Sequence, residues 1–187
     1  VRRGFFSIPA GRNQEQIAMS FVKSLQCKEC GAEYPISPRT VCDHDFGPVE
    51  VSYDYEAMKG NVTRRSIEGG PRSLWRYRDL LPIERSPKAG PRSGFTPLIR
   101  GERLAAELGV KELYIKDDSV NYPTYSYKDR VVSVAITKAI EFGFDTVGCA
   151  STGNLAHSVA AHAAVAGLRS FVMIPHDLEE GKITGSQ

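Results

Sequence analysis

The sequence predicts an α/β fold in which an open parallel sheet is flanked by helices. Two observations lead to this prediction. From residue 96 onward, short apolar strands alternate with apolar helices, which is the pattern of a parallel sheet covered on both faces. Turn residues such as Gly109 separate the strands from the helices.

We expect the elements of this α/β domain, residues 96–187, in the following order. A helix over about 102–108 ends at Gly109 and leads to a strand over 112–116. A long apolar helix is expected over 128–142. The remaining expected elements are a strand over 146–150, a helix over 155–166, a strand over 170–174 and the start of another helix near residue 181.

Three segments precede this domain. Residues 1–22 are expected to be a leader or upstream segment, because their first 13 residues carry arginines and no acidic side chain. Residues 23–53 are expected to form a zinc-ribbon-like module that ends in an alternating strand over 49–53. Residues 54–95 are a connector with one short helix over 73–81, closed by Pro82.

Composition and charge exclude several classes of protein. Of the 187 residues, 41% are hydrophobic and 25% are charged, which excludes a disordered chain and a coiled-coil rod. The formal charge of +2 is too small for a nucleic-acid-binding surface. No apolar run reaches the length of about 18 residues that spans a membrane. We therefore expect a cytoplasmic protein with a small-molecule partner, and a homodimer is compatible with this pattern.

Two loops follow strand ends, which is where open α/β sheets bind ligands. The first places Lys128 at a helix start, where the helix dipole favours the neutral amine that Schiff-base chemistry needs. The second, Ser151–Asn154, offers hydroxyls and backbone N–H groups to a carboxylate or phosphate. Structural roles are also open: Lys128 paired with Asp129 or Glu141, and Asn154 or Thr152 acting as a helix N-cap.

The motifs Ser126-Tyr127-Lys128-Asp129-Arg130 and Ser151-Thr152-Gly153-Asn154 resemble the two signature loops of threonine synthases, which are type II pyridoxal-phosphate enzymes. The segments 75–77, 94–98 and 116–124 and the cysteine module resemble the same family. The resemblance covers about residues 20–187. It implies the type II pyridoxal-phosphate fold, of which this sequence would be the N-terminal part.

The resemblance also implies the cofactor pyridoxal 5′-phosphate and a role for each loop residue. Lys128 would hold the cofactor as a Schiff base and move protons, and Asn154 would hydrogen-bond the 3-oxygen of its ring. Ser151, Thr152, Gly153 and Asn154 would bind the substrate carboxylate. The implied enzyme is a carbon–oxygen lyase that converts O-phosphohomoserine, an amino-acid phosphate ester, and water to threonine and phosphate.

Departures from the family keep other functions open. Tyr127 replaces a phenylalanine, Tyr122 and Tyr125 add bulk before Lys128, and Leu155 stands where many relatives carry a threonine. The glycines after residue 155 are isolated and form no loop for the cofactor phosphate, so we expect a fragment of a longer enzyme. The alternatives are a sister pyridoxal-phosphate enzyme that performs β-replacement or deamination, and a non-catalytic zinc-ribbon interaction module.

Three of the four cysteines are spaced as in a structural zinc site. Cys27 and Cys30 form a C-x-x-C pair, and Cys42 follows after eleven residues. A second C-x-x-C pair would need a cysteine at position 45, where the sequence has aspartate. The fourth ligand is open between His44 and Asp45, and a loop that binds no metal is equally open.

Some neighbouring side chains are assigned structural roles. Arg130 is expected to pair with Asp117, Asp118 or Asp129. Cys149 is expected to be a small buried strand residue. For His157 two interpretations stay open: a role near the leaving group, or a satisfied histidine at the surface or just outside the site. His162, on the same expected helix, is assigned no role.

Overall fold

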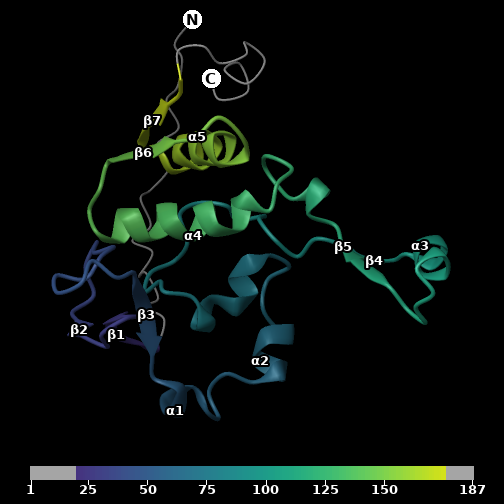
Figure 1. Ribbon diagram of the computed structural model, residues 1–187, viewed down its shortest axis with the longest axis horizontal. Helices are drawn as coiled ribbons and strands as arrows, with labels where there is room; N and C mark the ends of the chain where they lie inside the picture. The colour runs from purple at the N-terminus through teal and green to yellow at the C-terminus, as the bar shows by residue number, and fades with distance from the viewer. Residues whose placement is uncertain (1–19, 176–187) are drawn as a thin grey trace, which may run out of the picture.

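The computed structural model describes residues 20–175. Most of the expected leader and the expected helix near residue 181 lie outside the described residues. Figure 1 shows a small sheet (β1–β3), an arm formed by β4, β5 and α3, and a layer that contains α4, α5, β6 and β7. Within the described part of the chain, no helix is long and apolar enough to cross a membrane.

The N-terminal module is a three-stranded antiparallel sheet in the order β2-β1-β3. Its strands are β1 (Val22–Cys27), β2 (Glu33–Tyr34) and β3 (Val49–Tyr53). Leu25 in the central strand lies opposite Tyr34 on one side and Val51 on the other. The predicted strand over 49–53 is confirmed as β3, whereas β1 and β2 were not predicted.

The connector contains α1 (Tyr55–Met58), α2 (Arg64–Glu68) and a 3₁₀ helix, η1 (Leu74–Leu80). The short helix predicted over 73–81 is thus confirmed, with 3₁₀ geometry. Trp75 is buried, and its indole N–H donates to the Gly90 carbonyl at 2.8 Å. This bond docks the connector on the loop that precedes the α/β layer.

The arm corrects one predicted pairing. Its elements are β4 (Leu98–Arg100), α3 (Glu102–Glu107), β5 (Tyr114–Lys116) and the 3₁₀ turn η2 (Asp118–Val120). We expected the strand over 112–116 in the parallel sheet, but β5 pairs antiparallel with β4, with Ile99 opposite Ile115. The reason is local: Gly109, at a φ of 65°, lets the chain reverse after α3 and return beside β4.

The α/β layer matches the prediction closely. Its elements are α4 (Lys128–Glu141), β6 (Thr146–Ala150), α5 (Asn154–Ala166) and β7 (Arg169–Met173). Strands β6 and β7 are parallel, and α4 and α5 lie side by side in Figure 1. We expected helices on both faces of the sheet. In the described residues, helices cover one face of the β6–β7 pair, and the other face is open, with Phe171 62% exposed.

The core of this layer lies between α4 and α5. Its buried members are Ala89, Val132, Ile136, Val159 and Ala163. Val147 and Cys149 of β6 pack against this cluster. Cys149 is thus confirmed as a strand residue that packs on the core, but it is half-buried where full burial was expected. Burial raises the pKa of its thiol.

Candidate functional site

The loop before α4 is organised around one buried amide. Asn121 is 1% exposed, and its side-chain oxygen accepts a hydrogen bond from the Gly94 N–H at 2.8 Å. Its side-chain nitrogen donates to the Ser126 carbonyl at 2.8 Å. This amide therefore joins two separate motifs, segments 94–98 and 116–124, at the entrance to α4.

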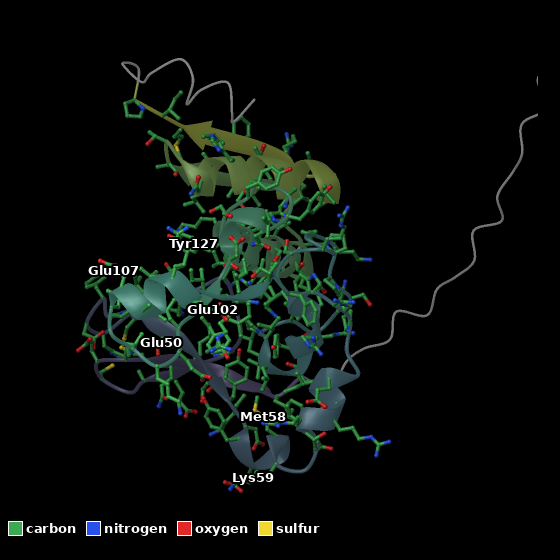
Figure 2. The ribbon with its side chains drawn as sticks, turned by 90° about the vertical axis from the view of Figure 1, so that its right-hand side faces the viewer. Glu50, Met58, Lys59, Glu102, Glu107 and Tyr127 are labelled. Atoms are coloured by element: carbon green, nitrogen blue, oxygen red, sulfur yellow. The ribbon has the colours of Figure 1, made fainter. Side chains whose placement is uncertain are left out.

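Lys128 is the first residue of α4, as the sequence predicted. Its backbone N–H donates to the Ser126 hydroxyl at 3.2 Å, which fixes the first turn. The side-chain amine lies 5.0 Å from the ring centroid of Tyr127. Tyr127 is 59% exposed, and Figure 2 shows it directly below the yellow-green layer of α5, β6 and β7. Lys128 is half-buried at the first turn of α4, beside this exposed ring.

The two acids that were alternative partners of Lys128 are engaged elsewhere. Asp129 is fully buried and accepts hydrogen bonds from the Thr124 hydroxyl at 2.7 Å and the Ser158 hydroxyl at 2.8 Å. Glu141 accepts from the Glu84 backbone N–H at 2.8 Å and from Lys138 at 2.9 Å. In the described residues Lys128 therefore forms no ion pair with Asp129 or Glu141, and its role stays a prediction.

A buried imidazole lies behind the start of α4. His162 of α5 is 1% exposed, and its Nε2 lies 3.3 Å from an Asp129 oxygen without hydrogen-bond geometry. Burial lowers the pKa of His162, and the nearby Asp129 opposes this only in part. The sequence assigned His162 no role, and the structure shows that it is buried and that its nitrogens lack hydrogen bonds. His157 is half-buried, and its Nε2 also lacks a hydrogen-bond partner among the described residues.

The second loop leaves the start of α5 open. The N-cap position is Gly153, with φ −143° and ψ −145°, and no side chain caps the helix. The alternative that Asn154 or Thr152 is an ordinary N-cap is therefore wrong. Asn154 is exposed, and the loop borders an open pocket of about 570 Å³ lined by Ala150, Ser151, Thr152, Met173, Ile174 and Pro175. Uncapped N–H groups at a helix start suit an anion.

The hydrogen bond between Asp129 and Ser158 joins the two loops. Lys128 directly precedes Asp129, and Asn154 lies one helical turn before Ser158. The starts of α4 and α5 are thus held at one edge of the α/β layer (Figure 1). Ser158 was missed in the sequence, because a serine in the middle of a helix gives no signal of its partner.

Comparison with known proteins agrees with this geometry. Residues 91–187 match the family of pyridoxal-phosphate dependent enzymes. The chain belongs to this family. Threonine synthase of Methanosarcina acetivorans is 43% identical over 155 residues, which cover 81% of this chain and 36% of the relative. Threonine synthase of Methanocaldococcus jannaschii is 39% identical over 159 residues, covering 84% of this chain and 38% of the relative. The chain thus spans little more than a third of the length of these relatives.

The described residues fit the cofactor of this pyridoxal-phosphate enzyme family. An aldehyde needs an amine that is not tied to a carboxylate, and Lys128 offers one at an open helix start. The ring oxygen of the cofactor needs a hydrogen-bond donor, and the exposed Asn154 amide at the start of α5 offers one. Lys128 and Asn154 are thus compatible with the cofactor roles that the sequence predicts for them.

A second polar network in this family member secures the arm. Arg130 donates to both Asp118 oxygens, at 2.9 and 2.7 Å. The hydrogen bonds from Arg130 hold the pKa of the Asp118 carboxyl at about 2. The Thr96 hydroxyl donates to Asp118 at 2.6 Å, and Lys116 donates to the Thr96 carbonyl. The predicted pairing of Arg130 is confirmed with Asp118, while the part played by Thr96 was missed.

The module of this pyridoxal-phosphate enzyme also brings possible metal ligands together. The ligand atoms of Cys27, Cys30, Cys42 and Asp45 all lie within 4.8 Å of one another. His44 is outside this group and contributes only its backbone N–H, at 3.4 Å from the Cys42 sulfur. Of the two candidate fourth ligands, the fold therefore brings in Asp45.

Proposed function

We propose that this chain forms the lysine-bearing part of a threonine synthase, which converts O-phosphohomoserine and water to threonine and phosphate. One observation carries the proposal: the Asp129–Ser158 hydrogen bond holds Lys128 and the Ser151–Asn154 loop at adjacent helix starts. The similarity to threonine synthases over about four fifths of the chain supports this substrate. The reaction class is a carbon–oxygen lyase.

Lys128 is the proposed catalytic base. When bound, the cofactor withdraws electrons from the substrate carbons, which makes their protons removable. Lys128 would then take and return a proton through its side-chain amine. Asp129 accepts hydrogen bonds from Thr124 and Ser158, so it does not pair with the Lys128 amine. The same hydrogen bonds fix the backbone next to Lys128.

The loop after β6 would orient the substrate. The uncapped N–H groups of α5, with the Ser151 and Thr152 hydroxyls, suit the substrate carboxylate, and Gly153 leaves space for a close approach. Asn154 is exposed at this edge and would donate to the ring oxygen of the cofactor. Leu155 packs against the core of the α/β layer. At this position many relatives are expected to carry a threonine hydroxyl.

The cofactor assignment is tested by reducing the purified chain with borohydride in the presence of pyridoxal phosphate and locating the adduct by mass spectrometry. We expect one adduct on Lys128, and its loss in Lys128→Ala. The matched control is Lys111→Ala, which removes an exposed lysine and should leave the adduct in place. Adducts spread evenly over exposed lysines would contradict the assignment.

The substrate is tested with the natural protein that carries this sequence. We expect phosphate release from O-phosphohomoserine, and its loss in Lys128→Ala. Turnover of serine, threonine or O-acetylserine without phosphate release would instead identify a sister enzyme of β-replacement or deamination. A Lys128 adduct without turnover of any of these would reject threonine synthesis while leaving the cofactor assignment in place.

A further inference from the structure

We propose that the N-terminal module, residues 20–53, holds one structural zinc ion bound by the thiolates of Cys27, Cys30 and Cys42 and by the carboxylate of Asp45. The proposal is independent of the proposed catalytic function. It depends on the repetition of one backbone turn, on the distances between the ligand atoms, on the space left for them and on the small core of the module.

The two ligand pairs lie on two copies of the same turn. In the first, the Cys27 carbonyl accepts from the Gly31 N–H at 3.1 Å, and the Cys27 N–H donates to the Ala32 carbonyl at 2.9 Å. In the second, the Cys42 carbonyl accepts from the Phe46 N–H at 3.2 Å, and the Cys42 N–H donates to the Gly47 carbonyl at 2.9 Å.

The backbone angles repeat as well. Gly31 has a φ of 76°, and Phe46, at the equivalent place, has a φ of 56°. The third residue after the first cysteine of each turn is Cys30 in one copy and Asp45 in the other. Asp45 therefore occupies the position of the fourth ligand, which explains why His44 does not.

Two of the distances between ligand atoms are those of a tetrahedral site, and all of the distances are within 4.8 Å. Zinc–sulfur bonds of about 2.3 Å and zinc–oxygen bonds of about 2.0 Å place two sulfurs about 3.8 Å apart, and a sulfur and an oxygen about 3.5 Å apart. The Cys30 and Cys42 sulfurs are 3.6 Å apart. The Cys27 sulfur lies 3.4 Å from the nearer Asp45 oxygen. A disulfide needs about 2.05 Å between sulfurs. Cys30 and Cys42 are therefore free thiols, available as ligands.

The surrounding residues leave space for the cluster and supply donors to it. A Cβ at Gly47 would lie 3.1 Å from the Cys27 sulfur and 3.0 Å from an Asp45 oxygen, so only glycine fits there without displacing a ligand. The Gly47 N–H donates to Asp45 at 2.9 Å, and the Tyr34 hydroxyl lies 3.0 Å from the Cys42 sulfur. Such outer donors stabilise thiolates and orient a carboxylate ligand.

The core of the module is too small without a cross-link. Its buried apolar residues are Phe21, Leu25, Cys27 and Cys42, so two of the four are the proposed ligands. Folded units below about 40 residues usually depend on a metal or on disulfides. Because four protein ligands fill a tetrahedral site, the ion would be structural, and its binding would release the protons of the three thiols.

Cobalt substitution tests both the site and its fourth ligand. The full chain is purified under reducing conditions, its zinc is measured, and Co²⁺ is titrated into the stripped protein. We expect about one zinc per chain, and tetrahedral cobalt bands with sulfur-to-cobalt charge transfer from three thiolates. Asp45→Ala should weaken cobalt binding by about tenfold or more, while Asp45→Cys should bind and show a stronger charge-transfer band from a fourth thiolate.

Two variants are matched controls. His44→Ala removes the competing ligand and should leave the spectrum unchanged. Asp43→Asn removes an exposed carboxylate that pairs with Arg39 and should also have no effect. The Asp45→Cys variant keeps the test decisive if Asp45→Ala fails to fold.

Three results would overturn the proposal. The first is a chain that folds with reduced thiols and binds neither zinc nor cobalt. The second is a spectrum lost in His44→Ala and unchanged in Asp45→Ala and Asp45→Cys. The third is a Cys30–Cys42 disulfide found by mass spectrometry in protein purified without oxygen.

Discussion

Asp129 is the residue on which the geometry of the two helix starts depends. It is fully buried, and three hydrogen bonds from Thr124 and Ser158 satisfy its carboxylate. A buried charge is tolerated only when it is paired in this way. Asp129, which directly follows the proposed catalytic lysine, therefore acts by fixing the backbone at the start of α4.

Replacement of Asp129 by asparagine should destabilise the chain by about 2–3 kcal/mol, because an amide nitrogen would face the hydrogen-bond donors. Urea unfolding followed by circular dichroism measures the change. The exposed Glu107, labelled in Figure 2, provides a control, since Glu107→Gln should change stability by less than about 0.5 kcal/mol. Equal stability of Asp129→Asn and the wild type would show that the network carries no stability.

His162 should make stability depend on pH in a narrow window. Burial lowers its pKa, so below an ordinary value of about 6.5 the unfolded chain binds a proton that the folded chain does not. Stability is therefore full above that pH and decreases as the pH falls toward the lower folded pKa. Between pH 7.5 and 5.5 we expect stability to fall steadily. Urea unfolding should show this slope reduced in His162→Gln, and an unchanged slope would argue against the assignment.

At the scale of elements, the second turn of the metal module contains a strained residue. Phe46 has a φ of 56° and is 80% exposed, so it occupies a left-handed conformation without the compensation of packing. Phe46→Gly should stabilise the chain by about 0.5–1 kcal/mol, as the equivalent Gly31 suggests. Thermal unfolding of the zinc-loaded chain tests this. Gly31→Phe is the reciprocal variant and should be destabilising, and a lower stability of Phe46→Gly would disprove the equivalence of the two turns.

Helices α4 and α5 and strands β6 and β7 could be predicted because each has enough residues for an apolar period to be visible. The strands β2 and β4 could not, since β2 has two residues and β4 has three. Strand β1 has six residues and was still missed, because its place in the sheet depends on pairing with distant partners. The antiparallel pairing of β5 depends on the chain reversal at Gly109. The order of predicted strands and helices alone does not reveal the direction of such a reversal.

The site follows the same division. Lys128, the Ser151–Asn154 loop and the three cysteines were visible as motifs, because chemistry fixes their residue types and spacing. The choice of Asp45 over His44 as the fourth metal ligand could be made only from the backbone conformation of the turn that begins at Cys42. The buried contacts of His162 and Ser158 required the packing of α5 on α4.

At the scale of the whole molecule, the module and the α/β layer have separate cores. The module is closed by the proposed metal cluster, while the layer is closed by Val132, Ile136, Val159 and their neighbours. Between them lies an open apolar pocket of about 370 Å³, whose walls include Leu25 and Val51 on one side and Ala135 and Phe142 on the other. A pocket of this kind couples the two parts weakly, because neither fills the space between them.

Removal of the metal should therefore unfold one part of the molecule. After a chelator strips zinc from the chain, we expect amide hydrogens of β1 and β3 to exchange faster, because the module loses the cross-link of its small core. Amides of α4 and α5 should keep their protection, since their core holds no metal ligand. Hydrogen–deuterium exchange with mass spectrometry measures both in one sample, and zinc added back is the control. Equal loss of protection in both parts would show that they unfold as a single cooperative unit. No loss in either part would show that the metal does not stabilise the fold.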